Sequence, residues 1–123
     1  MITGVQDVYY NVQEMARAVA FYRDVLGLEV TDESPHFTAL RAGGVRLGLH
    51  WTGGTAVPPI SHDNHGAHNG GSLTFRVADI EAAKQRLTAN GITILGASDN
   101  LWGKLAVFTD PDGNILKLMQ PPG

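Results

Sequence analysis

The hydrophobic and polar positions along this chain follow a pattern that occurs twice, at a shift of 65 residues. Residues 8–15 and 73–80 each pass through an apolar position, a polar or aromatic one, an aromatic, a polar residue and a valine, and then reach an acid and an aliphatic residue. Behind each segment, over residues 15–26 and 80–87, apolar residues recur at the spacing of an amphipathic helix. The pattern therefore predicts two copies of a strand that leads into a helix.

Each predicted helix ends at a glycine, and extended segments follow it. Gly27 and Gly91 take the left-handed conformation past a helix end at no steric cost, and the apolar β-type segments 28–30 and 92–94 come next. Each half then shows a hairpin with the glycine, aspartate or proline that tight turns need. The hairpin strands are predicted at 36–42 and 45–51, with a turn at 42–44, and at 104–109 and 114–120, with a turn at 110–114. Each half thus has the order βαβββ.

The predicted organisation is a single domain, residues 1–123, built from these two units. A chain of this length with 43% hydrophobic residues can bury one core but is too short for two ordinary domains. The units cover about 3–52 and 72–120. The stretch between them, 53–71, is rich in glycine, proline, asparagine and histidine, so we predict an exposed connector with the length that a lid needs.

Charge and composition narrow the class of partner. The formal net charge is −3 and the 9 basic residues are scattered, so we expect neither a nucleic-acid partner nor an anionic membrane surface. The absence of cysteine excludes disulfides, thiolate nucleophiles and Cys-ligated zinc, and agrees with a reducing cytoplasm. We find no secretory signal pattern and no apolar run of membrane-spanning length. These features predict a cytoplasmic protein with a small-molecule partner.

Two motifs resemble those of the glyoxalase/bleomycin-resistance/extradiol-dioxygenase superfamily. Residues 20–28, AFYRDVLGL, are similar to a helix end of that family, and residues 110–114, DPDGN, are similar to its last turn. The resemblance covers nearly the whole chain and implies an α+β fold, in which two βαβββ repeats form a curved mixed sheet around a cavity. It also implies a homodimer with two equivalent sites and, in many members, a divalent metal held by His or Glu in the first and last strands of each unit.

The metal-ligand positions that the resemblance implies are mostly occupied here by residues that do not bind metals. They fall at Asp7 and Ser72 in the first strands, and at Gly48 and Lys117 in the last strands. A divalent cation needs several anionic or imidazole donors at about 2.0 to 2.6 Å, which only the aspartate can supply. We therefore expect no metal cofactor at the usual position.

Strand alternation predicts which side chains line the cavity, with an aromatic residue at its rim. The candidate ligand-binding residues are Asp7, Tyr9, Asn11, Arg46, His50, Ser72, Arg76, Trp102 and Lys117. Because an unpaired charge is costly to bury, Lys117 needs either Asp7 or an anionic ligand near it. The alternative is that Asp7 and Lys117 form a pair that merely joins two neighbouring strands.

Three histidines of the connector form a second candidate metal site. His62, His65 and His68 follow His50 along the chain, and such a set could bind zinc, nickel or copper. A glycine-rich loop would lose considerable entropy on gathering them, and we identify no residues that would orient them. We expect no physiological metal there.

Three functions remain open, because this fold supports many reactions. The first is a metal-free protein that binds a small anionic or aromatic molecule in a dimer cavity. The second is a lyase, isomerase or dioxygenase with a displaced metal site that includes Asp7 and His50. The third is a metal-free enzyme in which His50 or Asp7 is the base and Lys117 or Arg76 stabilises an oxyanion. The sequence assigns no residue a definite catalytic role.

Overall fold

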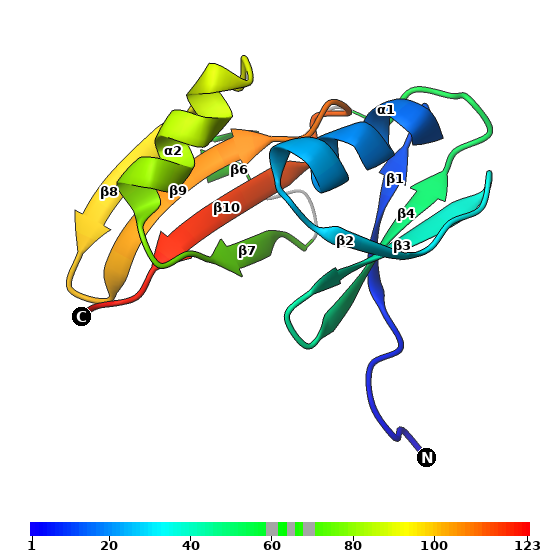
Figure 1. Cartoon of the computed structure of the whole chain (residues 1–123), viewed down its shortest axis with the longest axis horizontal. Coiled ribbons are helices and arrows are strands. Elements are labelled where there is room, and N and C mark those ends of the chain that lie inside the picture. The colour runs from blue at the N-terminus through cyan, green and yellow to red at the C-terminus, as the bar shows by residue number, and fades with distance from the viewer. Residues whose placement is uncertain (59–61, 64–65, 68–70) are drawn as a thin grey trace. The chain divides into compact units, whose positions relative to one another are not determined.

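The computed structural model describes residues 1–58, 62–63, 66–67 and 71–123. The chain divides into two compact units, Met1–Val57 and Pro58–Gly123, here called unit 1 and unit 2 (Figure 1). Each is described by itself. Among the described residues, no helix has the length and apolar character that crossing a membrane requires.

Unit 1 has the predicted βαβββ order. Its elements are β1 (Val8–Val12), α1 (Met15–Ala20), the π-helix η1 (Phe21–Val25), β2 (Glu29–Asp32), β3 (Phe37–Ala42) and β4 (Val45–Trp51). The sheet order is β1-β4-β3-β2, in which β1 is parallel to β4 and the other pairs are antiparallel.

Unit 2 repeats this arrangement, which confirms the internal repeat seen in the sequence. Its elements are β7 (Leu73–Arg76), α2 (Ile80–Ala89), β8 (Gly96–Asn100), β9 (Gly103–Thr109) and β10 (Ile115–Gln120). The sheet order is β7-β10-β9-β8, and again the first pair is parallel and the others antiparallel. The connector contains two short paired strands, β5 (His62–Asp63) and β6 (Gly66–Ala67), which we did not predict.

One predicted strand is wrong in position. Residues 92–94 lie outside the sheet, and β8 begins at Gly96. The cause is competition for a backbone donor: the N–H of Ile92 bonds to the Leu87 carbonyl at 3.0 Å, so it belongs to the end of α2. Pairing with β9 starts only where the Leu95 N–H reaches the Val107 carbonyl at 2.8 Å.

The AFYRDVLGL motif is explained by local structure. Tyr22 is fully buried, whereas Arg23 donates to the exposed Asp24 at 2.8 Å and so lowers the pKa of that carboxyl. Gly27 has φ of 76°, and the Leu28 N–H bonds to the Tyr22 carbonyl at 3.0 Å, which closes the helix end.

The helix of each unit packs on one face of its own sheet. In unit 1, α1 contacts β3 and β4, and in unit 2, α2 contacts β9 and β10. The side chains on these covered faces are buried, among them Val12, Leu40, Leu47 and Leu49 in unit 1 and Ala106, Phe108, Leu116 and Leu118 in unit 2. Because side chains alternate along a strand, the residues between them project from the opposite face, which we call the open face of each unit.

The DPDGN motif is a turn organised by one buried carboxylate. Asp110 is 3% exposed and accepts hydrogen bonds from the backbone N–H groups of Asp112 and Asn114, both at 2.9 Å, and from the Asn114 side chain at 2.8 Å. Gly113 has φ of 84°, which glycine adopts without strain. The turn joins β9 to β10 and so fixes the register that places Lys117.

Replacing Asp110 with alanine is expected to lower the free energy of unfolding by about 3 kcal/mol, because three bonds to a buried carboxylate are lost together. Urea unfolding followed by circular dichroism measures the change. The exposed Asp99, in which the same substitution should cost less than ~0.5 kcal/mol, is the control. Equal losses in the two variants would contradict this role of the motif.

Candidate functional site

The open face of unit 1 groups several of the predicted residues around one glycine. In the register, Tyr9 and Ala39 lie on either side of Gly48, and Asn11 and Phe37 lie on either side of His50. Arg46 lies opposite Arg41 at the end of the sheet near the β3–β4 turn. Unit 1 therefore places Tyr9, Asn11, Arg46 and His50 on one face, as strand alternation predicted.

Phe37, which we did not predict, covers the position of Gly48. A Cβ atom added at Gly48 would overlap the Cζ atom of the Phe37 ring, and would lie 2.8 Å from its Cε2 atom and 2.9 Å from the Tyr9 Cβ. Such distances essentially do not occur between real atoms, so any side chain at position 48 must displace the ring. The sequence does carry one signal for this contact. A glycine inside a strand often marks a site where another group approaches the backbone closely.

Three rings gather over this glycine. The centroids of Tyr9 and Phe37 lie 6.1 Å apart in an edge-to-face arrangement, and His50 lies 5.5 Å from Tyr9 and 6.5 Å from Phe37. We call Tyr9, Phe37 and His50 the aromatic platform. Tyr9 remains 52% exposed, so the platform presents ring surface on which a planar molecule could stack.

A guanidinium lies beside the aromatic platform. The Cζ atom of Arg46 is 5.9 Å from the Phe37 ring centroid, within the range of a cation–π contact. Its nearest carboxylates are Asp7 at 4.0 Å and Asp32 at 3.9 Å, both longer than a hydrogen bond. Among the described residues, the buried Nε atom of Arg46 has no hydrogen-bond partner. The Arg46 guanidinium is thus held near two acids without being hydrogen-bonded by them.

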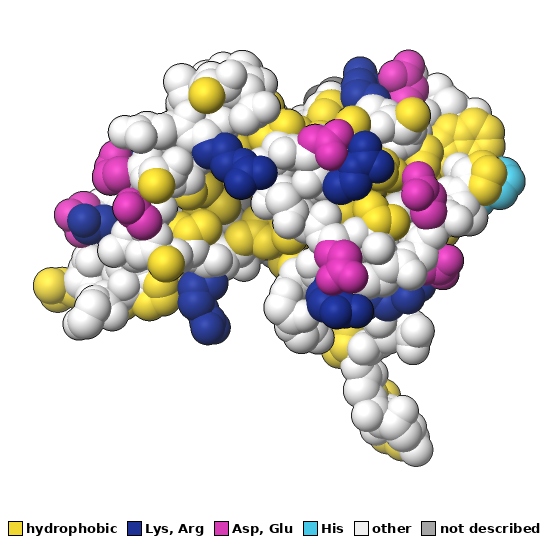
Figure 2. Space-filling view, viewed as in Figure 1, with side chains coloured by type: hydrophobic (Ala, Val, Ile, Leu, Met, Phe, Trp, Pro, Cys, Tyr) yellow, Lys and Arg dark blue, Asp and Glu magenta, His cyan; other side chains and the backbone are white. Residues whose placement is uncertain are grey.

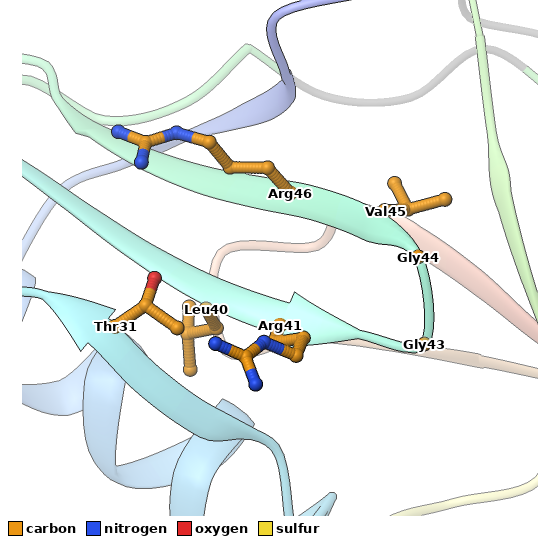
Figure 3. Close-up of a pocket in the computed structure, with 7 residues that line it drawn as sticks. All are labelled: Thr31, Leu40, Arg41, Gly43, Gly44, Val45 and Arg46. Carbon is orange, nitrogen blue, oxygen red and sulfur yellow. The ribbon is translucent and has the colours of Figure 1, made fainter.

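The same arginine lines a hollow at the β3–β4 turn. The hollow has a volume of about 430 Å³ and is lined by Thr31, Leu40, Arg41, Gly43, Gly44, Val45 and Arg46 (Figure 3). Glu29 lies 3.5 Å from Arg41. Two arginines thus face three acids around this hollow, counting Asp7 and Asp32. The surroundings of the hollow therefore have no excess of positive charge. Charges of opposite sign also lie side by side elsewhere on unit 1 (Figure 2).

Four further predicted residues lie in unit 2. Lys117 on β10 lies between Thr74 and Val107, and Arg76 lies opposite Met119. Ser72 precedes β7 and is exposed, and Trp102, 54% exposed, lies at the tip of the β8–β9 hairpin. An ion pair between Asp7 and Lys117 would join the two units, and it stays a prediction.

The residues at the metal-ligand positions that the resemblance implies do not form a set that fits a divalent metal. Lysine and glycine offer no ligand at positions 117 and 48, and the Phe37 ring lies over the latter. Across the described parts of the chain, no group of three or more His, Cys, Asp or Glu could hold a metal ion. Of the connector histidines, His62 lies in β5, and His65 and His68 lie outside the described residues.

Comparison with known proteins identifies the family. Residues 4–118 match the model of the glyoxalase/bleomycin resistance protein/dioxygenase superfamily. The chain belongs to this superfamily. Its two βαβββ units with mixed four-stranded sheets have the glyoxalase fold, as the motifs had implied.

Individual relatives of this superfamily member differ in function. The chain is 29% identical over 120 residues to a metallothiol transferase FosB from Staphylococcus haemolyticus, covering 96% of this chain and 84% of the relative. The fosfomycin resistance protein FosX from Listeria monocytogenes has a TM-score of 0.78 at 14% identity, covering 99% of this chain and 96% of that one. TnmS3, an antibiotic binding protein from a Streptomyces species, has a TM-score of 0.68 at 22% identity, covering 99% and 100%. The two structural likenesses concern the fold alone.

A double-mutant cycle tests the contact between Phe37 and Gly48. Gly48→Ala is expected to lower the free energy of unfolding by about 2 kcal/mol, because it overpacks the face. In a Phe37→Ala background the same substitution should cost less than half as much, since the ring is gone. The measurement is urea unfolding of the four proteins. An identical cost in both backgrounds would show that the ring does not occupy this space.

Proposed function

We propose that this protein binds a small anionic or aromatic molecule in the cavity of a homodimer, without the usual superfamily metal. The observation that carries the proposal is the Phe37 ring over Gly48, which replaces a metal-ligand position with apolar ring surface. A cytoplasmic location, the dimer and the ligand all remain predictions.

The chemistry of the open face of unit 1 supports this function. Small-molecule sites are mostly apolar and aromatic, with a few polar groups that fix orientation. The aromatic platform supplies the first feature, and Arg46, Asn11 and His50 supply the second. TnmS3, which has this fold, is an antibiotic binding protein.

A metal-dependent enzyme is the second candidate. It is favoured by the similarity to FosB, which is a metallothiol transferase. A displaced metal site would need Asp7 and His50 together with ligands that the described residues do not gather around them. Asp7 would also have to leave Arg46, which lies 4.0 Å away. The third candidate is a metal-free enzyme with His50 or Asp7 as base. It uses the same cavity as the binding protein and differs from it only in converting the bound molecule.

Ligand screening of metal-free protein tests the proposal. After chelation, the protein is expected to keep its melting temperature and to show a saturable rise of that temperature with at least one member of a panel of antibiotics and aromatic acids. Phe37→Ala should weaken the binding of that compound about tenfold, because the platform loses one of its three rings. Binding that appears only after a divalent metal is added would refute the metal-free function and favour the enzyme.

A further inference from the structure

The open face of unit 2 carries two cations and no acid. Lys117 projects from β10, and Arg76 projects from the adjacent β7 on the same face. Arg76 lies opposite Met119, the next residue of β10 on that face. The register places no aspartate or glutamate on this face in any of the strands β7, β8, β9 and β10. Asp99 of β8 lies opposite Lys104 on the other face. This face therefore has a positive charge that its own strands do not balance.

The side chains of Lys117 and Arg76 form no hydrogen bond or ion pair with the residues that the structure describes. Lys104 is also without such a partner among the described residues, whereas Lys84 and Arg46 have acids close by. Lys84 lies 3.3 Å from Glu81 in the same unit, and Arg46 of unit 1 has two carboxylates within 4.0 Å. The pair on the open face of unit 2 is thus free to meet an anion.

Apart from Thr74 on β7, the neighbours of the lysine on this face are apolar. Val107 lies opposite Lys117 on β9, Leu105 lies opposite Met119, and Ile115 precedes Lys117 on the same face. Lys117 is half-buried among them. Because an ammonium group in apolar surroundings lacks the stabilisation that water gives, a bound anion would interact with it more strongly than at an exposed site.

The spacing of these groups suits a molecule with two parts. Residues that share a face along one strand are about 7 Å apart, and neighbouring strands are about 4.8 Å apart. An acidic group beside Lys117 would therefore leave the rest of a small molecule over Val107, Leu105 and Met119. A charged head and an apolar body are needed together, since inorganic anions would gain nothing from the aliphatic surface.

We propose that the open face of unit 2 binds an amphiphilic anion, a carboxylate or sulfonate attached to an apolar body, with Lys117 as the anchor of the charged group. This inference rests on the proposed binding function and adds the charge of the ligand and the residue that selects it. Lys117 occupies a position where metal-binding relatives are expected to have an acid. In place of an acidic side chain that would bind a metal cation, this chain has a lysine that would bind an anionic ligand.

Two fluorescent probes of nearly the same shape test the inference. Anilinonaphthalene sulfonate carries a negative charge, and phenylnaphthylamine is its neutral counterpart. Lys117→Met, which keeps most of the aliphatic stem, is expected to weaken sulfonate binding about tenfold and to leave binding of the neutral probe unchanged. Lys117→Arg should restore most of the affinity. Fluorescence titration at constant ionic strength measures the affinity of each protein for each probe.

Lys104→Met is the matched control, because Lys104 lies on the adjacent strand but on the other face. It removes the same charge and should change neither affinity by more than about twofold. The inference fails if Lys117→Met and Lys104→Met lower the affinity for the sulfonate equally, or if Lys117→Met lowers the affinity for both probes alike. In either case Lys117 does not select the anion, while the proposed binding function stands. A wild-type protein that binds neither probe also overturns the inference, and the panel of antibiotics and aromatic acids then judges the binding function separately.

Discussion

The packing of Phe37 against Gly48 is the constraint on which the chemistry of unit 1 depends. With no side chain at position 48, the ring can lie over the middle of β4, and there it contacts Tyr9, His50 and the guanidinium of Arg46. A ligand side chain for a metal and this ring cannot occupy the same space. Gly48 is one of the positions at which the resemblance implies a metal ligand, and here it supports an aromatic surface instead.

The two units keep one topology but carry different chemistry on their open faces. In unit 1, rings lie beside arginines that have acids nearby, so its charge is nearly balanced. The open face of unit 2 carries aliphatic residues and two cations, and its strands place no acid there. Duplication of a βαβββ unit followed by divergence of its open face would produce such a division, since the covered face must stay apolar to pack on its helix.

The sequence was sufficient for the order of the strands and helices because those signals were local. Hydrophobic periodicity and the glycines at positions 27 and 91 predicted the strand–helix order, and the structure confirms it in both units. The strand expected at 92–94 is wrong because Ile92 completes the end of α2, and periodicity does not reveal which partner a backbone donor takes. Strand alternation assigned Arg46, Gly48 and His50 to one face, but Phe37 was missed, since its ring leans across to a neighbouring strand. The pairing of Asp7 with Lys117 depends on how the units meet, which no local pattern encodes.

The central claim is that ring surface and cations replace the metal of this superfamily. Elemental analysis of purified, tag-free protein by plasma mass spectrometry tests it most directly, with samples taken after dialysis and after reloading with manganese, iron, nickel and zinc. The account predicts trace metal in every dialysed sample, because positions 48 and 117 offer no ligands. Near-stoichiometric metal that resists dialysis would contradict the claim, and would point to a displaced site built from other residues.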